Sequence, residues 1–302
     1  MRATATTALA LILLAPAALA LGAPEGDLGT EEHPVLWALV PLGDDAAAAA
    51  EIAERIYELT GIRIQAVVTD SYGAILEALS ATPAGAHMTV LPAIPYLAAQ
   101  ERRLVEPGLV AVRAESTSYA AKVMVNSETG AEELTGLSGL SFARPGPQSD
   151  SGWIVPALLM RAEGLDPEEL GTLLDLGAHP AVVEAVYNRE ADAGAVHVGG
   201  LAAFRDQYED LDERIAVLAE SAQIPNEGLQ FAPRVPQEMR TLITNAFLQL
   251  VESPDGAELL RRIYSWDALE QASDRAYDDL RGLLDRAELT SEQLLNQDNP
   301  NR

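Results

Sequence analysis

Short apolar runs alternate with amphipathic segments along the first third of the chain. Residues 34–41 form an apolar run typical of a buried strand, residues 46–61 follow a helical pattern that ends in a glycine, and residues 62–69 resemble a second strand. This order predicts a β-α-β unit. Because the alternation continues to residue 103, we expect a mostly parallel sheet flanked by helices.

A second block of the same kind begins near residues 117–129, where a longer strand of small and branched residues is predicted. Strands and helices then alternate to about residue 222, and two strongly helical segments and an acidic tail follow. The chain of 302 residues, 48% of them hydrophobic, is long enough for two units of ordinary domain size. We therefore expect an α/β protein with two similar halves.

The amino terminus has the layout of a secretory signal peptide. Arg2 precedes an apolar run at residues 8–20, and the small residues Ala18 and Ala20 offer a cleavage point. The run is shorter than the ~20 residues that span a bilayer, although an uncleaved anchor or a buried helix remains the alternative. We predict a signal peptide at residues 1–22 and export to the periplasm or the cell exterior. The sequence has no cysteine, which excludes disulfides and a lipoprotein anchor on cysteine.

Charge and motifs limit the function further. Lys and Arg number 20 against 46 Asp and Glu, a formal net charge of -26, so we expect neither a nucleic-acid partner nor an anionic membrane surface. The sequence lacks a G-x-S-x-G elbow, a Walker P-loop, a G-x-G-x-x-G turn and an H-E-x-x-H helix, and its four histidines lack metal-ligand spacing. We predict a protein that is not an enzyme and that uses no cofactor or metal.

One stretch, SFARPGPQSDSGWIVPALLM, carries a candidate anion site. Ser149, Asp150 and Ser151 stand where a loop enters a helix, and unpaired backbone N–H groups at such a helix start attract anions. The two serines add hydroxyl donors, and Gly152 permits a close approach of the backbone. Simple helix capping explains the same residue types equally well.

Several segments, taken in order, resemble a known family. They are VVTDSYGAILEAL, LPAIPYLAA, STSYAAKVMVNSETG, LTGLSGLSFARPGPQSDSGWIVPALLM, GAHPAVVEAVYNREADAGAV and IPNEGL. Their order and spacing resemble those of the phosphate, phosphite and phosphonate substrate-binding proteins of ABC importers. The resemblance implies a type II periplasmic binding protein fold, in which two lobes, each a mostly parallel sheet flanked by helices, are joined by two crossing strands. On that basis we place lobe 1 at residues 33–117 and 223–300 and lobe 2 at residues 118–222.

The other candidate ligand residues lie near predicted strand ends or at the crossing. Tyr72 and Tyr96 follow two strands, where ligands of open α/β sheets collect, and the resemblance implies aromatic ligand contacts at these positions. Ser118 lies at the first crossing between the lobes, where strand-edge solvation is an alternative explanation. The resemblance implies a ligand contact for His179, and Asp192 is included as a binding or supporting residue. Packing remains the alternative for both tyrosines.

Asp150 departs from the small or hydroxylated residue that the family commonly has at the centre of this loop. It either caps the helix and points outward, or accepts a hydrogen bond from a protonated ligand oxygen or a ligand amine. The resemblance implies a monomeric protein that captures a small phosphorus oxyanion and delivers it to an ABC permease and its ATPase. Alternatives on the same fold are a sulfonate, a pyrimidine or another small organic ligand, and a sensor domain.

Overall fold

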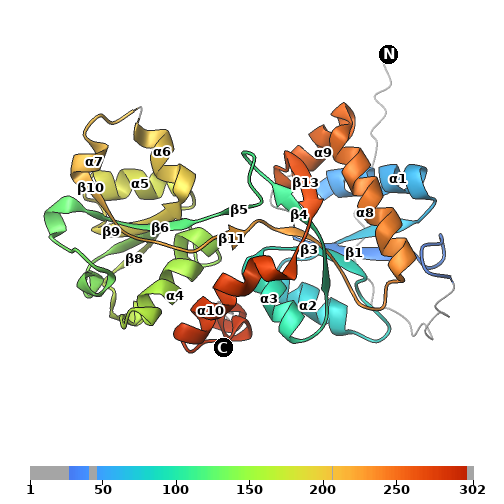
Figure 1. Ribbon diagram of the computed structural model, residues 1–302, viewed down its shortest axis with the longest axis horizontal. Helices are drawn as coiled ribbons and strands as arrows, with labels where there is room; N and C mark the ends of the chain where they lie inside the picture. Colours follow the sequence, from blue (N-terminus) through green and yellow to red (C-terminus); the bar gives the residue numbers. More distant parts are fainter. Residues whose placement is uncertain (1–26, 41–45, 206, 298–302) are drawn as a thin grey trace, which may run out of the picture.

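The computed structural model describes residues 27–40, 46–205 and 207–297, which fold into two lobes lying side by side (Figure 1). The signal peptide predicted for residues 1–22 lies outside the described residues. Within the described ranges, no helix combines the length and the apolar character needed to cross a bilayer.

Lobe 1 is built on a six-stranded sheet with the strand order β13-β4-β12-β3-β1-β2. Its strands are β1 (Val35–Leu39), β2 (Ile64–Val68), β3 (Met88–Leu91), β4 (Glu106–Val112), β12 (Gly228–Phe231) and β13 (Ala268–Gln271). The strands β1, β2 and β3 are parallel, whereas β12 runs antiparallel to both β3 and β4. The sheet is therefore mixed, because β12 and β13, which come from the C-terminal part of the chain, run antiparallel to their neighbours.

Five helices cover this sheet, and the local sequence explains where they form. They are α1 (Ala46–Thr60), α2 (Tyr72–Ser80), α3 (Ala93–Glu101), α8 (Gln237–Glu252) and α9 (Pro254–Tyr264). Helix α1 ends one residue before Gly61, whose φ of 71° suits glycine best, so the helix predicted at 46–61 is confirmed. Helices α1, α8 and α9 pack together on one face of the sheet, and α2 and α3 lie on the other (Figure 1).

Lobe 2 contains a five-stranded sheet with the order β10-β6-β9-β7-β8. Its strands are β6 (Ala121–Asn126), β7 (Phe142–Arg144), β8 (Leu173–Asp175), β9 (Ala193–His197) and β10 (Ile215–Glu220). Its helices are α4 (Val155–Ala162), α5 (His179–Tyr187), α6 (Val198–Arg205) and α7 (Leu211–Arg214). The strands β7, β8 and β9 are parallel, and β6 is antiparallel to β9 and β10.

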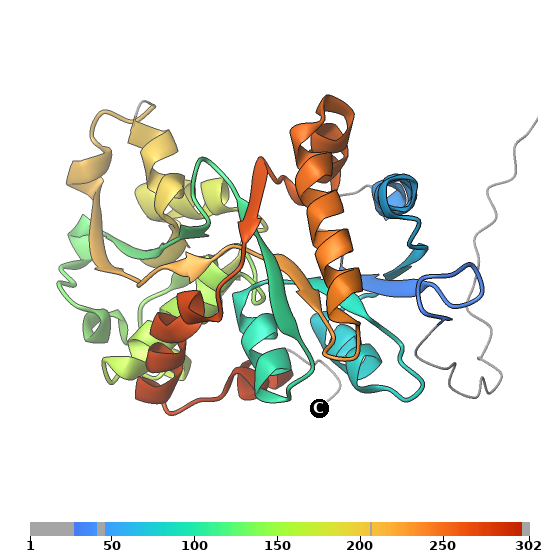
Figure 2. The ribbon, with the colours of Figure 1, turned by 45° about the vertical axis from the view of Figure 1, so that its right-hand side comes forward.

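Two short strands connect the lobes. Strand β5 (Ser118–Tyr119) pairs antiparallel with β11 (Ile224–Pro225), and both lie between the two sheets (Figure 1). The C-terminal segment also spans the junction, because α10 (Asp278–Arg286) packs against α4 of lobe 2 while α11 (Ser291–Gln297) packs against α3 of lobe 1 (Figure 2). Two crossing strands and a C-terminal helical pair thus hold the lobes together.

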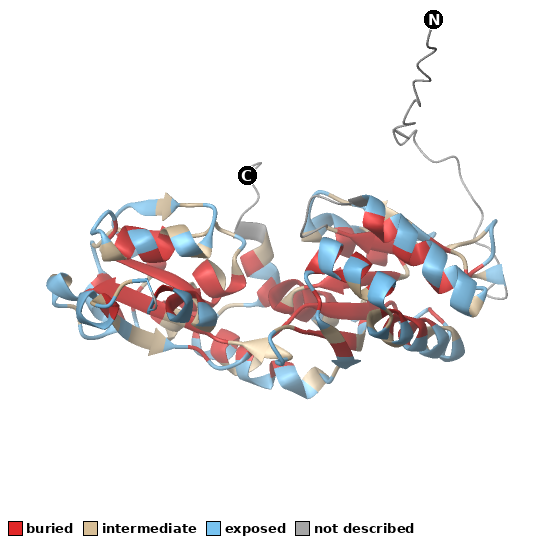
Figure 3. Ribbon diagram, turned by 90° about the horizontal axis from the view of Figure 1, so that it is seen from above, coloured by how far each residue is buried: buried red, intermediate tan, exposed pale blue. Residues whose placement is uncertain are grey.

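The largest hydrophobic core lies in lobe 1 and extends into lobe 2. Trp37, at the centre of β1, is fully buried, with its ring centroid 5.8 Å from that of Phe247. The same core includes Val155 and Leu158 of α4, and two smaller cores belong to lobe 2. Figure 3 shows the buried residues along the sheets and the inner helix faces. The predicted two-lobed α/β fold with two crossing strands is confirmed.

Candidate functional site

The carboxyl ends of the parallel strands of both lobes lie at the junction between them. In lobe 2 the first residue of β6, Ala121, follows the crossing strand β5 and pairs with His197 at the end of β9. Strands β7 and β8 are parallel to β9, so the segments after all three strands lie at this edge. In lobe 1, Tyr72 follows β2 and Ala93 follows β3. Open α/β sheets bind ligands at edges of this kind.

The serine loop, which we define as residues 149–151, follows β7 and opens a helical segment. Ser149 caps it, because its Oγ accepts a hydrogen bond of 3.0 Å from the backbone N–H of Gly152. A π-helical turn, η4 (Asp150–Ile154), then leads into α4. A Cβ at Gly152 would collide with Pro145, so glycine is required for this close approach. The capping interpretation is confirmed for Ser149, and Ser151 is buried in the first turn.

Asp150 points into the junction between the lobes. Its side chain belongs to lobe 2, but its carboxyl lies close enough to lobe 1 to interact electrostatically with the backbone N–H of Ala93, the first residue of α3. Asp150 is only 9% exposed, so the expectation of an outward-pointing cap is wrong. Burial raises the pKa of this carboxyl to about 7, and the negative charge of Glu227 contributes, while the interaction with the Ala93 backbone acts in the opposite direction.

Three phenols interact electrostatically with Asp150. Tyr72 is the first residue of α2, and burial raises the pKa of its phenol, with further contributions from Asp150 and Glu227. Burial and the same two carboxylates raise the pKa of Tyr119 in β5, and they also contribute at Tyr277, whose pKa burial raises. These phenols therefore keep their protons at neutral pH and can act as hydrogen-bond donors.

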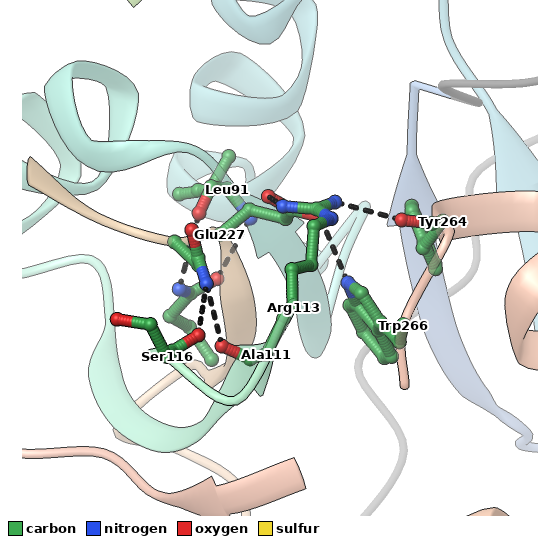
Figure 4. A network of polar contacts seen from close by, with 9 residues as sticks. Leu91, Ala111, Arg113, Ser116, Glu227, Tyr264 and Trp266 are labelled. Carbon is green, nitrogen blue, oxygen red and sulfur yellow. Dashed lines mark hydrogen bonds and ion pairs between the residues drawn. The ribbon is translucent and has the colours of Figure 1, made fainter. Parts of the chain in front are cut away.

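A second buried carboxylate, Glu227, lies beside the crossing strand β11, and sequence analysis did not identify it. It is 7% exposed and forms an ion pair with both terminal nitrogens of Arg113. The indole N–H of Trp266 donates to Glu227 Oε1 at 2.8 Å, and Arg113 also donates to the carbonyl of Tyr264 at 2.7 Å. Figure 4 shows this network. The segment IPNEGL, which carried part of the family resemblance, was the available signal.

The side-chain hydroxyls of Tyr96 and Ser118, both predicted to contact the ligand, donate hydrogen bonds to other side chains of the protein. Tyr96 is fully buried, its hydroxyl donates to Asp274 at 2.8 Å, and its ring centroid lies 4.2 Å from that of Tyr277. This geometry supports the packing alternative for Tyr96. Ser118 Oγ donates to Gln223 Oε1 at 2.9 Å, which connects the two crossing segments.

His179 and Asp192 lie at opposite edges of the lobe 2 sheet. His179 is the first residue of α5, and its ring centroid is 4.8 Å from that of His197, at an angle of 80°. Burial, with a contribution from His197, lowers the pKa of His179 to about 4, so it is neutral at physiological pH. Asp192 precedes β9 at the amino end, where its Oδ2 accepts hydrogen bonds from the backbone and hydroxyl of Ser141. This placement gives Asp192 a structural role away from the junction.

The geometry offers hydroxyl and backbone N–H groups as hydrogen-bond donors for a small polar ligand. Among the described residues, no cluster of three or more His, Cys, Asp or Glu side chains is arranged to hold a metal ion. The family model described as ABC transporter, phosphonate, periplasmic substrate-binding protein matches residues 44–277. This chain belongs to that family. The phosphonate substrate-binding proteins are transport components, and the resemblance drawn from the motifs is confirmed.

Solved structures share this fold at low identity. A binding protein of a Pseudomonas aeruginosa ABC phosphonate transporter is 18% identical, with a TM-score of 0.58 over 89% of this chain and 90% of that one. PhnD1 from Prochlorococcus marinus, solved with methylphosphonate, is 11% identical, with a TM-score of 0.57 over 84% and 98% of the two chains. A Xanthomonas citri protein solved with ATP is 14% identical, with a TM-score of 0.67 over 88% and 99%. The type II periplasmic binding protein fold is therefore confirmed.

Proposed function

We propose that this protein captures a small phosphorus oxyanion (phosphonate, phosphite or phosphate) between its lobes and delivers it to an ABC permease with its ATPase. It acts as an exported monomer, needs no cofactor and performs no catalysis. Membership of the phosphonate substrate-binding family supports the transport role. The methylphosphonate complex of PhnD1 is a precedent for the ligand class on the same fold.

The burial of Asp150 at the junction, within reach of the Ala93 backbone, is the observation that carries the proposal. It brings the serine loop of lobe 2 to the N-terminus of α3 in lobe 1, beside the half-buried Tyr72. Backbone N–H groups, hydroxyls and protonated phenols therefore converge at the junction. Such neutral donors interact strongly with an anion when water is excluded.

The two crossing strands provide the movement that capture requires. A change in backbone angles in β5 and β11 separates the lobes, admits the ligand and closes them over it. The Ala93 to Asp150 contact crosses the junction, so it forms only when the lobes are together. We include Tyr72, the serine loop and His179 in the ligand site, and Ser118 in the hinge. We assign Tyr96 and Asp192 to the surrounding structure.

Binding can be tested by calorimetry with phosphate, phosphite, methylphosphonate and sulfate on the wild type and on a Ser149→Ala, Ser151→Ala variant. We expect the variant to lose at least about tenfold in affinity, since each lost hydrogen bond to an anion costs about 1.5–3 kcal/mol. Ser253→Ala is a matched control, because Ser253 caps α9 through the same Oγ to Gly256 N–H contact, at 3.2 Å. It should lose cap stability but no affinity. Unchanged affinity in the double variant would remove the serine loop from the site.

A further inference from the structure

We propose that Asp150 makes the site selective for an oxyanion that carries a proton, with that proton held between a ligand oxygen and the Asp150 carboxylate. The proposal rests on the proposed function and defines its ligand more narrowly. Phosphates, phosphites and phosphonates near neutral pH fit this description, because the dissociation that converts their monoanions into dianions occurs in that range. Sulfate and sulfonates do not fit, since they are fully ionised.

The location of Asp150 is the first argument. It lies between the two serines of the serine loop, buried at the junction, where a ligand that contacts both lobes has to approach it. The backbone N–H of Ala93, from the opposite lobe, interacts with this carboxyl. A ligand oxygen that takes the Ala93 N–H on closure would be placed directly against this carboxylate.

The surrounding charges are the second argument. The titratable groups that face Asp150 from the neighbouring elements are three phenols and one carboxylate: Tyr72, Tyr119, Tyr277 and Glu227. Arg113, the cation that acts on Tyr119, is already paired with Glu227 through both of its terminal nitrogens. No cation of the described residues contributes to the pKa of Asp150. A fully ionised oxyanion beside an ionised Asp150 would therefore meet uncompensated like charge in a dry environment.

One proton converts this repulsion into a charge-assisted hydrogen bond. An ionised carboxylate has only acceptor sites, so a ligand P–OH can donate to it, whereas a sulfonate has no proton to give. A sulfonate can bind only after Asp150 itself takes up a proton from solvent. Burial raises the pKa of Asp150 to about 7, which places this uptake near neutral pH and makes sulfonate binding weaken as the pH rises.

Methylphosphonate and methanesulfonate provide a sharp test, because they have the same shape and differ in the ionisable proton. Calorimetry just above neutral pH should show that the wild type prefers methylphosphonate by at least about tenfold, as expected for a site built to accept a ligand O–H. In Asp150→Asn we expect the preference to fall to less than about threefold, because the amide can donate to either ligand. Asp255→Asn, the same change at an exposed position of α9, should retain the wild-type preference.

A second measurement needs no variant. Titrations of the wild type in two buffers with different ionisation enthalpies count the protons exchanged, and we expect methanesulfonate to take up more protons than methylphosphonate. Equal preference in wild type and Asp150→Asn, or equal proton uptake for both ligands, would overturn the role of Asp150 and leave oxyanion binding intact. If the wild type binds none of methylphosphonate, phosphite and phosphate, the proposed function fails and the Asp150 proposal fails with it.

Discussion

Asp150 and Glu227 are two buried carboxylates at the same junction, and their partners differ in kind. Glu227 has the guanidinium of Arg113 and the indole N–H of Trp266, so its charge and its oxygens are compensated within lobe 1. The carboxyl of Asp150 interacts instead with the backbone N–H of Ala93 in the opposite lobe. Their exposed fractions, 7% and 9%, are almost equal.

The difference separates structure from function. A buried charge that is fully paired within one lobe gives the ligand little to interact with and serves to fix the strands around it. A buried carboxylate whose partner lies in the opposite lobe is not fully compensated within its own lobe. It can therefore interact strongly with a ligand that binds at the junction and closes it. We therefore interpret Glu227 as part of the lobe 1 end of the hinge and Asp150 as part of the ligand site.

The largest expected effect comes from removing the cation of the paired carboxylate. Arg113→Met leaves Glu227 charged and buried, and we expect the free energy of unfolding to fall by about 3 kcal/mol. We take the lower end of the usual range because the Arg113 side chain is 31% exposed. Urea unfolding followed by circular dichroism measures the change.

A double variant tests the reason for that loss. Arg113→Met combined with Glu227→Gln removes the lone charge, so it should recover roughly half of the lost stability. If Arg113→Met alone lowers the free energy of unfolding by less than about 1 kcal/mol, the charge of Glu227 does not depend on Arg113 for its stability. The proposed difference in charge compensation between Glu227 and Asp150 is then wrong.

The second effect concerns the carboxylate without a cation. Because folding raises the pKa of Asp150 from 3.8 to about 7, its contribution to stability is complete below the lower value and is lost as the pH rises through the higher one. Relative to Asp150→Asn, the free energy of unfolding of the wild type should fall across this window, by on the order of 2 kcal/mol. Urea unfolding of both proteins at several pH values measures this difference.

His179 also makes stability depend on pH in this range, but its contribution changes in the opposite direction. Its pKa falls from 6.5 to about 4 on folding, so its contribution is present above the higher value and is lost as the pH drops through the lower one. The wild type and Asp150→Asn both contain His179, and its effect cancels in their difference. A difference that does not change with pH would mean that Asp150 is as well compensated as Glu227.

The sequence predicted the local architecture well because periodicity is a local property. The strand expected at residues 34–41 is β1 at Val35–Leu39, and the alternation that continues to residue 103 is present as β1 to α3. The antiparallel β12 could not be predicted in its place between β3 and β4, because its partners lie more than a hundred residues away in the sequence.

The candidate site was predictable only in part, and the two tyrosines show why. Tyr72 and Tyr96 both occur shortly after strands, but Tyr72 begins its helix whereas Tyr96 is the fourth residue of α3. Three positions further into its helix, Tyr96 meets Asp274 and Tyr277, which return from the C-terminal segment. Likewise, the inward direction of Asp150 depends on Ala93 in the other lobe.

The smallest expected effect concerns a third carboxylate, Asp274, which accepts a hydrogen bond from Tyr96. Burial raises its pKa, but hydrogen bonds from Arg281 and Tyr96 outweigh burial and hold the pKa below its ordinary value, so it is compensated as Glu227 is. Tyr96→Phe should lower the free energy of unfolding by about 1 kcal/mol, the net value of one hydrogen bond, and leave affinity for methylphosphonate unchanged. Tyr72→Phe is the counterpart, expected to weaken binding and leave stability nearly unchanged. Loss of affinity in Tyr96→Phe would show that the ligand site reaches further into α3 than the contacts of Asp150 indicate.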